Sequence, residues 1–561
     1  MKKCLGLNLC LVWSLSATLT LGATRAPVTN AKGLVASSSP IASEVGAQIL
    51  RQGGTAADAA VAVGFALAVT WPSAGNIGGG GFALIHADGG PDRFIDYRET
   101  APAAAGPDFY LNAKGELDAS ASRVGYRASG VPGTVAGLAL LHKRWGKLPW
   151  KTLLEPARKL AESGFIVDQA LAESLQHSQE LLEGNAETRK IFFKKGHVIG
   201  RGERLIQKDL ARSIAALERG PEAFYEGSVG KAIIADIQKN RGVLSAKDLS
   251  SYKVVEREPL RRKWRDFEVV TAPPPSSGGA VLLAILGMLE KDNLEAMGSG
   301  SADYVHLLTE TMKKAFADRS TWFGDPTFVS NPIDKLLDPV YLAKRRSEIS
   351  MTAAAHDIKP GELPGEKPDT THFTIRDSHG MTISNTYTLN GSYGTGIVAK
   401  GTGILLNNEM DDFTSKIGAS NMFGLTQGKR NLIAPGKRPL SSMTPTFVYR
   451  GKDLILALGA PGGPTIINSV AQTLLNRLVF HMDIQQAADA PRFHHQWMPD
   501  KLLYEPFGLN PDTKKALEAR GQIFRDEART FGDVEALAWD DELRLWTGAS
   551  DSRNGGAVAA E

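Results

Sequence analysis

The chain has 561 residues, of which 42% are hydrophobic and 22% are charged. These values are ordinary for globular proteins, so the chain can bury a sizeable core as two domains or as one large layered domain. Its 58 glycines show no period, which excludes a collagen-like chain. The net charge is +3, and the densest basic run, residues 261–265, closely follows Glu256 and Glu258. We interpret that run as a solvated strand or loop face, and we expect no nucleic-acid partner.

The first 26 residues have the pattern of a secretory signal peptide. Lys2 and Lys3 precede a mostly apolar stretch at 5–21, and small residues follow up to Ala26. An uncleaved anchor is the alternative, but the stretch is short and contains several Ser, Thr and Asn residues. No later apolar run is long enough to span a membrane, so we expect a periplasmic or secreted protein. Both cysteines, Cys4 and Cys10, lie in this segment, and the mature chain would have no disulfide, thiol nucleophile or thiolate metal site.

The first elements that the sequence predicts after this segment are two helices. Apolar residues recur at helical spacing from Ser39 to about Arg51, and the following Gly53-Gly54 is typical of a helix C-terminus. Thr55 can cap a second, Ala-rich helix that runs to about Val69. Four glycines at 78–81 then lead into a predicted strand at 82–85. Because this cluster lacks a P-loop ending and opens no helix, we interpret it as a place where backbones approach closely.

The middle of the chain is predicted to be largely helical at 150–250 and 300–350. A turn-rich stretch at 273–279 interrupts this region, with a helix expected to begin at Ala280. Residues 353–369 are polar, contain three prolines and show no period, which indicates an exposed linker where a chain can be cut. The period then changes to two at 370–375 and 381–389, predicting a hairpin with Gly380 in the left-handed conformation. That register sets Thr370 opposite Thr388.

Hydroxyl groups are the remaining candidates for chemistry. The sequence has no metalloprotease, zinc, P-loop or dinucleotide motif, so we expect no cofactor. We also expect no metal, since the adjacent His494 and His495 would point to opposite faces of a strand. Among Ser276-Ser277, Ser441-Ser442 and Thr370-Thr371, Thr370 has a distinctive position at the start of a strand after the linker. A cut before it would free an α-amino group with a pKa of about 7.7–8.0 as a general base. By position alone, a plain edge-strand residue is the alternative.

Ten short motifs occur together, in order, along the chain. They are GLVASS at 33–38, GGTAADAA at 53–60, DYRETAP at 96–102, VPG at 131–133, PPSSGG at 274–279, TYTLN at 386–390, NNEMDDF at 407–413, RPLSSM at 438–443, PGG at 461–463 and APRFHH at 490–495. In this order and spacing, the chain from about residue 34 to 561 resembles the γ-glutamyltransferase (γ-glutamyltranspeptidase) family.

The resemblance implies an α+β fold, a four-layer αββα sandwich of the N-terminal-nucleophile hydrolase type. It implies a precursor that cleaves itself between Asp369 and Thr370 into a large subunit, 27–369, and a small subunit, 370–561, which stay together. Thr370 would be the processing residue and the nucleophile, with Thr388 bonded to it. By the same resemblance, Arg98, Ser441 and Ser442 would bind the substrate α-carboxylate. Asn390, Glu409 and Asp412 would bind the α-ammonium group, and the backbone N–H groups of Gly462 and Gly463 would form the oxyanion hole.

The implied activity is cleavage of the γ-glutamyl amide of glutathione and related compounds, with transfer to water, amino acids or peptides. A glutaryl-type acylase of the same fold is the first alternative, which the acceptors Asn390, Glu409 and Asp412 disfavour. A non-catalytic secreted binding protein is the second. Three positions depart from relatives: Asp369 before the cut, Phe423 in the segment at 416–437 that resembles an active-site lid, and Pro464 after the glycine pair.

Overall fold

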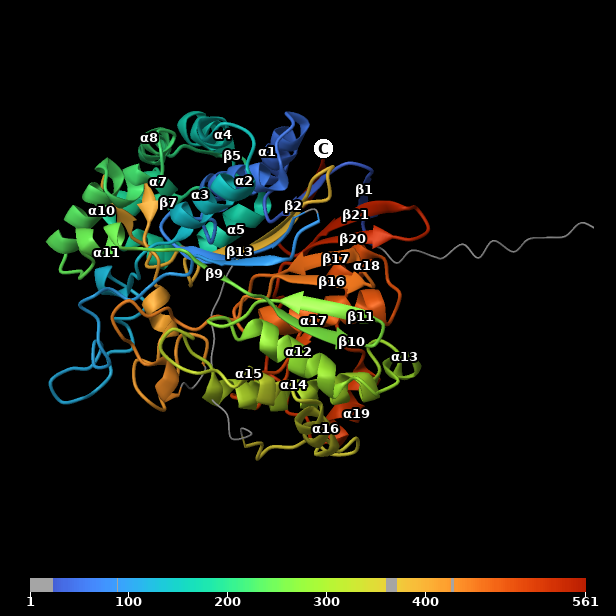
Figure 1. Cartoon of the computed structure of the whole chain (residues 1–561). Helices are drawn as coiled ribbons and strands as arrows, with labels where there is room; N and C mark the ends of the chain where they lie inside the picture. Colours follow the sequence, from blue (N-terminus) through green and yellow to red (C-terminus); the bar gives the residue numbers. More distant parts are fainter. Residues whose placement is uncertain (1–23, 88, 360–370, 425–427) are drawn as a thin grey trace, which may run out of the picture.

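The structure, a computed structural model, describes residues 24–87, 89–359, 371–424 and 428–561. Two β-sheets pack face to face, and helices cover the outer face of each, so the molecule has four layers (Figure 1). The predicted α+β class and its αββα layering are confirmed. Most of the predicted signal peptide and the predicted cut at Asp369-Thr370 lie outside the described residues.

The first sheet contains the strand that would follow the cut. Its strands pair in the order β22-β2-β12-β13-β3-β4-β9, and all these pairs are antiparallel. Their bounds are β2 Leu34–Ser37, β3 Gly80–His86, β4 Arg93–Asp96, β9 Val255–Arg257, β12 Thr371–Arg376, β13 Thr382–Thr388 and β22 Ala557–Ala560. Strands from both sides of residue 370 therefore build this sheet.

The second sheet has the order β1-β21-β20-β17-β16-β11-β10 and is also antiparallel. Its bounds are β1 Val28–Asn30, β10 Leu260–Trp264, β11 Phe267–Thr271, β16 Thr446–Arg450, β17 Asp453–Gly459, β20 Glu535–Asp540 and β21 Leu545–Ser550. The basic run at 261–265 falls mainly on β10, an edge strand with alternating exposure, as its interpretation as a strand face requires.

Helices before residue 250 cover the first sheet. Helix α1 begins after Ser39, whose Oγ caps the Ala42 N–H, and α2 begins after a reciprocal capping box between Thr55 and Asp58. Every residue of α2 is buried, because it is enclosed by the sheet and by other helices. The helices of this layer are α1 Pro40–Arg51, α2 Ala56–Thr70, α3 Thr134–Trp145, α4 Trp150–Ser163, α5 Gln169–His177, α6 Gln179–Glu183, α7 Ala186–Phe192, α8 Lys208–Leu217, α9 Glu222–Tyr225, α10 Ser228–Lys239 and α11 Ala246–Ser250.

The remaining helices lie mainly beside the second sheet. Helix α12 begins at Gly278, two residues before the predicted Ala280, and the Oγ of the preceding Ser276 accepts from the Gly278 N–H at 3.1 Å. A Cβ on Gly279 would lie 2.1 Å from the carbonyl oxygen of Ala272, so this start needs glycine. The helices are α12 Gly278–Met288, α13 Leu294–Met297, α14 Ala302–Trp322, α15 Ile333–Leu336, α16 Pro339–Ser347, α17 Thr465–Leu478, α18 Ile484–Asp489 and α19 Pro511–Ala519.

Short elements complete the described residues. They are the strand pairs β5 Phe165–Ile166 with β8 Arg204–Leu205, β6 Phe193–Lys194 with β7 His197–Val198, β14 Val398–Ala399 with β15 Ile404–Leu405, and β18 Phe493–His494 with β19 Leu503–Tyr504, and the 3-10 helices η1 Tyr126–Ala128, η2 Glu409–Asp412 and η3 Lys429–Asn431.

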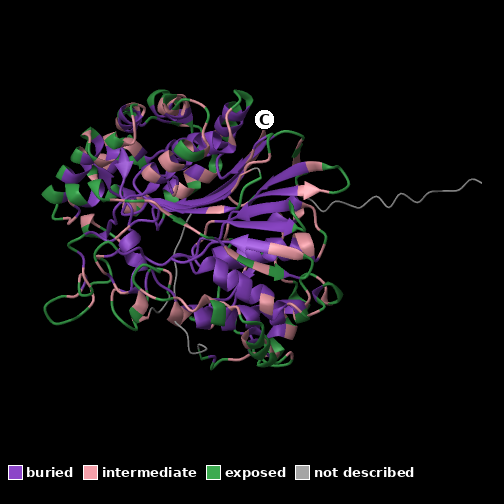
Figure 2. Ribbon diagram, in the orientation of Figure 1, coloured by how far each residue is buried: buried purple, intermediate pink, exposed green. Residues whose placement is uncertain are grey.

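Three apolar clusters hold the layers together. One lies between the first sheet and its helices, one between the second sheet and its helices, and one between the two sheets. The third includes Phe82 and Phe94 of the first sheet and Phe447 and Leu537 of the second. Burial follows the layers: the central strands of both sheets are buried, and exposure is found on outer helix faces, on loops and on edge strands such as β10 (Figure 2).

The predicted hairpin is confirmed for its described part. Thr371 pairs with Tyr387 and Arg376 with Thr382, which is the predicted register, and Gly380 has a φ of +91° in the turn. Thr370, at the end of the same register, lies outside the described residues. The glycines at 78–81 are, as predicted, a place where backbones approach closely, because a Cβ on Gly79 would lie 1.8 Å from the carbonyl oxygen of Thr388.

Candidate active site

Arg98, just after β4, is completely buried and is the positive centre of the site. Its Nη1 lies 2.5 Å from Glu409 Oε1, and its Nη2 lies 2.5 Å from Asp412 Oδ2. The same Nη2 donates to the carbonyl oxygen of Leu440 at 2.9 Å. Burial disfavours a charged guanidinium, but the surrounding carboxylates outweigh burial and raise the pKa of Arg98. It therefore stays a cation.

Three buried carboxyl groups surround this one cation. Glu409 and Asp412 come from the short helix η2, and Glu99 Oε2 lies 4.0 Å from Arg98 Nη1. Burial raises the pKa of Glu409, and burial together with the neighbouring charge of Glu409 raises the pKa values of Glu99 and Asp412 well above the usual range. The raised pKa values favour the protonated form of these carboxyl groups, and a second cation in the cluster would favour their ionised form.

Several acceptor atoms of the cluster lack an N–H or hydroxyl donor within the described part of the chain. Asn390 donates from Nδ2 to the carbonyl oxygen of Asn408 at 3.0 Å, but its Oδ1 is buried without a donor. Glu409 Oε2 and Asp412 Oδ1 also have no N–H or hydroxyl donor among the described residues, and the carboxyl groups of Asp412 and Glu99 face that of Glu409 as hydrogen-bonding groups. Buried acceptors without N–H or hydroxyl donors are costly, and the oxygens of these three residues are chemically suited to receive the hydrogens of an ammonium group.

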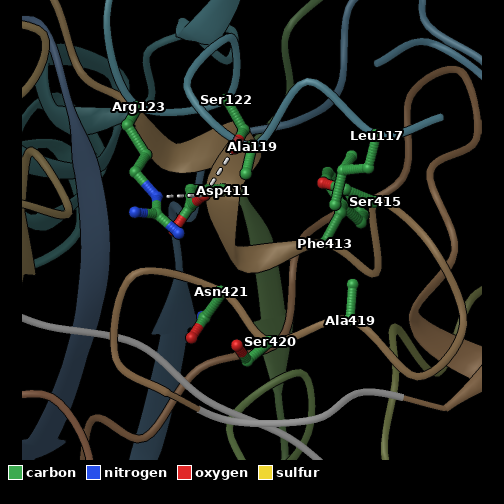
Figure 3. A pocket seen from close by; sticks show the side chains of 10 residues that line it. All are labelled: Leu117, Ala119, Ser122, Arg123, Asp411, Phe413, Ser415, Ala419, Ser420 and Asn421. Atoms are coloured by element: carbon green, nitrogen blue, oxygen red, sulfur yellow. Dashed lines mark hydrogen bonds and ion pairs between the residues drawn. The ribbon is translucent and has the colours of Figure 1, made fainter. Parts of the chain in front are cut away.

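The neighbouring Asp411 has a different role, which its sequence position did not reveal. Ser122 Oγ donates to its Oδ1 at 2.5 Å, and Arg123 Nε lies 3.5 Å from the same oxygen (Figure 3). Its Oδ2 accepts from the N–H of Met422 at 2.9 Å. Asp411 thus ties the loop at 117–123 and the segment at 419–424 to η2 and does not contact Arg98.

Thr388 ends β13 beside this cluster. Its Oγ1 accepts from the N–H of Asn390 at 2.7 Å and is fully buried. Thr388 pairs with Gly80 of β3, and a Cβ on Gly80 would lie 2.5 Å from Glu99 Oε2. The glycine therefore lets the end of β13 approach the acidic cluster.

Ser441 and Ser442 follow the backbone that Arg98 contacts. Ser441 Oγ accepts from the N–H of Met443 at 3.1 Å. Ser442 Oγ accepts from Arg319 Nη2 of α14 at 2.8 Å. Arg319 is a second buried cation near the pair, and its helical sequence context gave no signal for this position.

Gly462 and Gly463 form the turn between β17 and the N-terminus of α17. Their φ values are +124° and +61°, which favour glycine. The end of β17, which leads into this turn, lies against the start of β12, because a Cβ on Gly459 would lie 2.2 Å from His372 Cε1. Backbone N–H groups at a helix N-terminus stabilise negative charge.

The structure thus places Arg98, Glu409 and Asp412 in one cluster, with Thr388 and Ser441-Ser442 at its borders. Asn390 is held next to η2 by its hydrogen bond to the carbonyl oxygen of Asn408. Gly462-Gly463 follows the end of β17, which lies against the start of β12. Glu99, Asp411 and Arg319 are the residues that sequence reasoning missed. Within the described residues no group of three or more His, Asp and Glu side chains is arranged to hold a metal ion, and no helix is long and apolar enough to cross a membrane.

Comparison with known proteins gives consistent matches over almost the whole chain. The family model described as Gamma-glutamyltranspeptidase matches residues 42–561. A protein named glutathione hydrolase proenzyme from Pseudomonas sp. (strain A14) is 46% identical over 506 residues, covering 90% of this chain and 88% of that protein. A protein of the same name from Escherichia coli (strain K12) is 44% identical over 534 residues, covering 94% and 91%.

A solved structure extends the comparison to the fold. The crystal structure of cephalosporin acylase from Bacillus halodurans superposes with a TM-score of 0.86 at 27% identity, covering 98% of this chain and 99% of that one.

Proposed function

The chain belongs to the γ-glutamyltranspeptidase family, and we propose that it matures by cleavage between Asp369 and Thr370 and then transfers γ-glutamyl groups by way of Thr370. The fragments would be a large subunit of 27–369 and a small subunit of 370–561. They would stay associated because each supplies strands to both sheets. Removal of residues 1–26 as a signal peptide would place the enzyme in the periplasm or outside the cell.

The observation that carries the proposal is the buried cluster of one guanidinium and three carboxyl groups. A γ-glutamyl group carries an α-carboxylate and an α-ammonium group on one carbon. Such a zwitterion can insert where Arg98 now pairs with Glu409 and Asp412. Its carboxylate would bind Arg98 and the hydroxyls of Ser441 and Ser442. Its ammonium group would donate to the oxygens of Asn390, Glu409 and Asp412 that have no N–H or hydroxyl donor in the described part of the chain.

The reaction follows from a freed N-terminus at Thr370. The α-amino group would accept the proton of Thr370 Oγ, and the oxygen would attack the γ-carbonyl carbon. The N–H groups of Gly462 and Gly463 would stabilise the oxyanion of the tetrahedral intermediate. The C–N bond would then break, the proton would pass to the leaving amine, and an ester with Thr370 would remain. Water would release glutamate from that ester, and an amino acid or peptide amine would give the transfer product.

The acylase fold neighbour makes a glutaryl-type substrate the second candidate. A glutaryl chain has only the terminal carboxylate, so it would leave the buried acceptors of Asn390, Glu409 and Asp412 without a cation. The desolvation cost of those acceptors argues against it. Glutathione, a γ-glutamyl amide with a peptide leaving group, fits the cluster.

Hydrolysis of glutathione by purified protein tests the proposal, with intact-mass measurement of both fragments. Two fragments that begin after the signal peptide and at Thr370, together with glutamate release, are expected. An intact chain with no glutamate release would overturn it.

A further inference from the structure

Asp533 is a buried carboxyl group that the proposed reaction does not use. It is 1% exposed and lies between Gly532 and β20. Its neighbour Gly532 contacts the proposed oxyanion-hole turn, since a Cβ on Gly462 would lie 3.5 Å from the N atom of Gly532. The residue is therefore adjacent to the reaction centre without belonging to the Arg98 cluster.

Polar groups from four segments surround the Asp533 carboxyl group. Ser38, after β2, and Asn554, near the C-terminus, face it as hydrogen-bonding groups, and Arg492 and Asp551 are the nearest charges. Glu535 is a further buried acid that faces it from β20. Yet neither Asp533 oxygen completes a hydrogen bond of ordinary geometry with a described residue.

The charges around Asp533 do not neutralise it. Arg492 Nη2 is 2.7 Å from Asp551 Oδ2, and Arg553 Nη1 is 2.8 Å from Asp551 Oδ1, so Asp551 takes both guanidinium groups. Burial, followed by the charge of Asp551, raises the pKa of Asp533 to about 7. The group can thus change its charge near neutral pH.

Ser38, which faces Asp533, also contacts Thr371, the first residue of β12. Ser38 Oγ lies 3.3 Å from Thr371 Oγ1, and both side chains are buried. An ionised Asp533 only accepts, so Ser38 would donate to it and accept from Thr371. A protonated Asp533 would donate to Ser38, which would then donate to Thr371. The direction of the hydroxyl chain therefore depends on one proton.

We propose that Asp533 is a positioning residue for the reaction proposed above. Its ionised form, through Ser38, holds the Thr371 hydroxyl group in the orientation required at the start of β12. The proposal rests on the proposed function for the identity of that reaction. Ser38 lies before residue 370 and Asp533 after it, so this chain of groups would also join the two fragments.

The first test measures kcat and KM against pH for γ-glutamyl anilide hydrolysis by the matured protein and by Asp533→Asn. The free α-amino group and Asp533 must both lose a proton, so log kcat of the unchanged enzyme should rise with a slope of about 2 on the acid side. Asp533→Asn should reduce the slope to about 1 and leave KM unchanged. Asp541→Asn, an exposed carboxylate paired with Arg450, should keep the original profile. A parallel profile for Asp533→Asn, lowered equally at every pH, would overturn the proposal.

The second test does not need activity and so separates this proposal from the proposed function. Infrared difference spectra of the whole protein, with Asp533→Asn as the reference, follow the protonated Asp533 carboxyl group against pH. Because a hydrogen bond from Ser38 favours the ionised form, Ser38→Ala should move this titration to higher pH. An unmoved titration would show that Ser38 and Asp533 are not coupled, whatever substrate the enzyme accepts.

Discussion

Arg98 Nη1 and Glu409 Oε1 lie 2.5 Å apart, and both side chains are completely shielded from solvent. An ion pair so buried is a weak source of stability, because desolvation of the two charges offsets most of their attraction. The pair can instead serve as a binding site for a zwitterion, with Arg98 facing its negative group and Glu409 facing its positive group. It leads directly to a prediction about substrate choice.

Substrate selectivity should depend on the acidic half of this binding site. We expect kcat/KM for a γ-glutamyl anilide to exceed that for the glutaryl anilide by at least roughly 10². This factor is smaller than the largest discrimination that enzymes show against a substrate that lacks a polar group the site is built to bind. Asp412→Asn should narrow the gap by slowing only the γ-glutamyl substrate. Asp411→Asn is the matched control, since Asp411 faces Ser122 and Met422. Equal rates on both anilides in the unchanged enzyme would favour an acylase.

Maturation should require the hydroxyl of Thr370. Thr370→Ala should remain one chain, because no oxygen is left to attack the preceding carbonyl carbon. Intact-mass measurement distinguishes a single chain from two fragments. Thr374→Ala, four residues further along the chain in β12, is the control and should still split. A Thr370→Ala protein that separates before residue 370 would contradict the proposed processing step.

Thr388→Ala should slow both maturation and turnover. We expect a loss of about 2–4 kcal/mol in the barrier, or roughly 10²–10³ in rate, as for one oriented polar contact in a reaction centre. Thr382→Ala at the other end of β13, where the hydroxyl contacts the turn at Gly380, should change neither rate by a comparable factor. Circular dichroism and thermal unfolding verify that both variants fold. Unchanged kinetics in Thr388→Ala would remove this residue from the site.

The glycine turn before α17 should not tolerate a side chain. In Gly462→Ala the new Cβ would meet Thr465 Oγ1 at 2.4 Å, at a φ of +124°, so the N–H groups should move and kcat should fall by about 10² or more. Gly451→Ala has a φ of +62° in an exposed turn with no atom near its Cβ. That control also places an alanine at a positive φ, in the left-handed region, and should retain kcat.

The pH dependence of stability should reveal the buried Glu535. Burial, reinforced by the charges of Asp533 and Asp551, raises the pKa of Glu535 well above the usual range. The folded state therefore holds a proton that the unfolded state releases above a pH of about 4.3, so this residue makes stability fall as pH rises toward its folded pKa. Glu535→Gln should flatten the fall in Tm between roughly pH 5 and 8. The exposed Glu542→Gln should keep the original slope, and an equal slope in both variants would contradict the assignment.

Much of the fold could be predicted from local patterns. Helix α1 and helix α2 have capping residues at Ser39 and Thr55, and each begins where those residues predict. The register of β12 with β13 could be predicted because a short turn around Gly380 fixes which residues face each other. The start of α12 was predicted two residues late, because Ser276, whose Oγ accepts from the Gly278 N–H, is held by the backbone of the distant residues 441 and 443.

The sequence by itself determined the local structure and the identity of the candidate groups, since capping, strand period and motif order are properties of neighbouring residues. Only the tertiary structure decided that Arg98 and Asp412, 314 positions apart, share a dry ion pair, that Asp411 turns away from it, and that Asp533 lies beside Gly462 through Gly532. Burial and charge pairing depend on which strands lie side by side. The pairing of strands from both halves of the chain is a long-range property that no local pattern encodes.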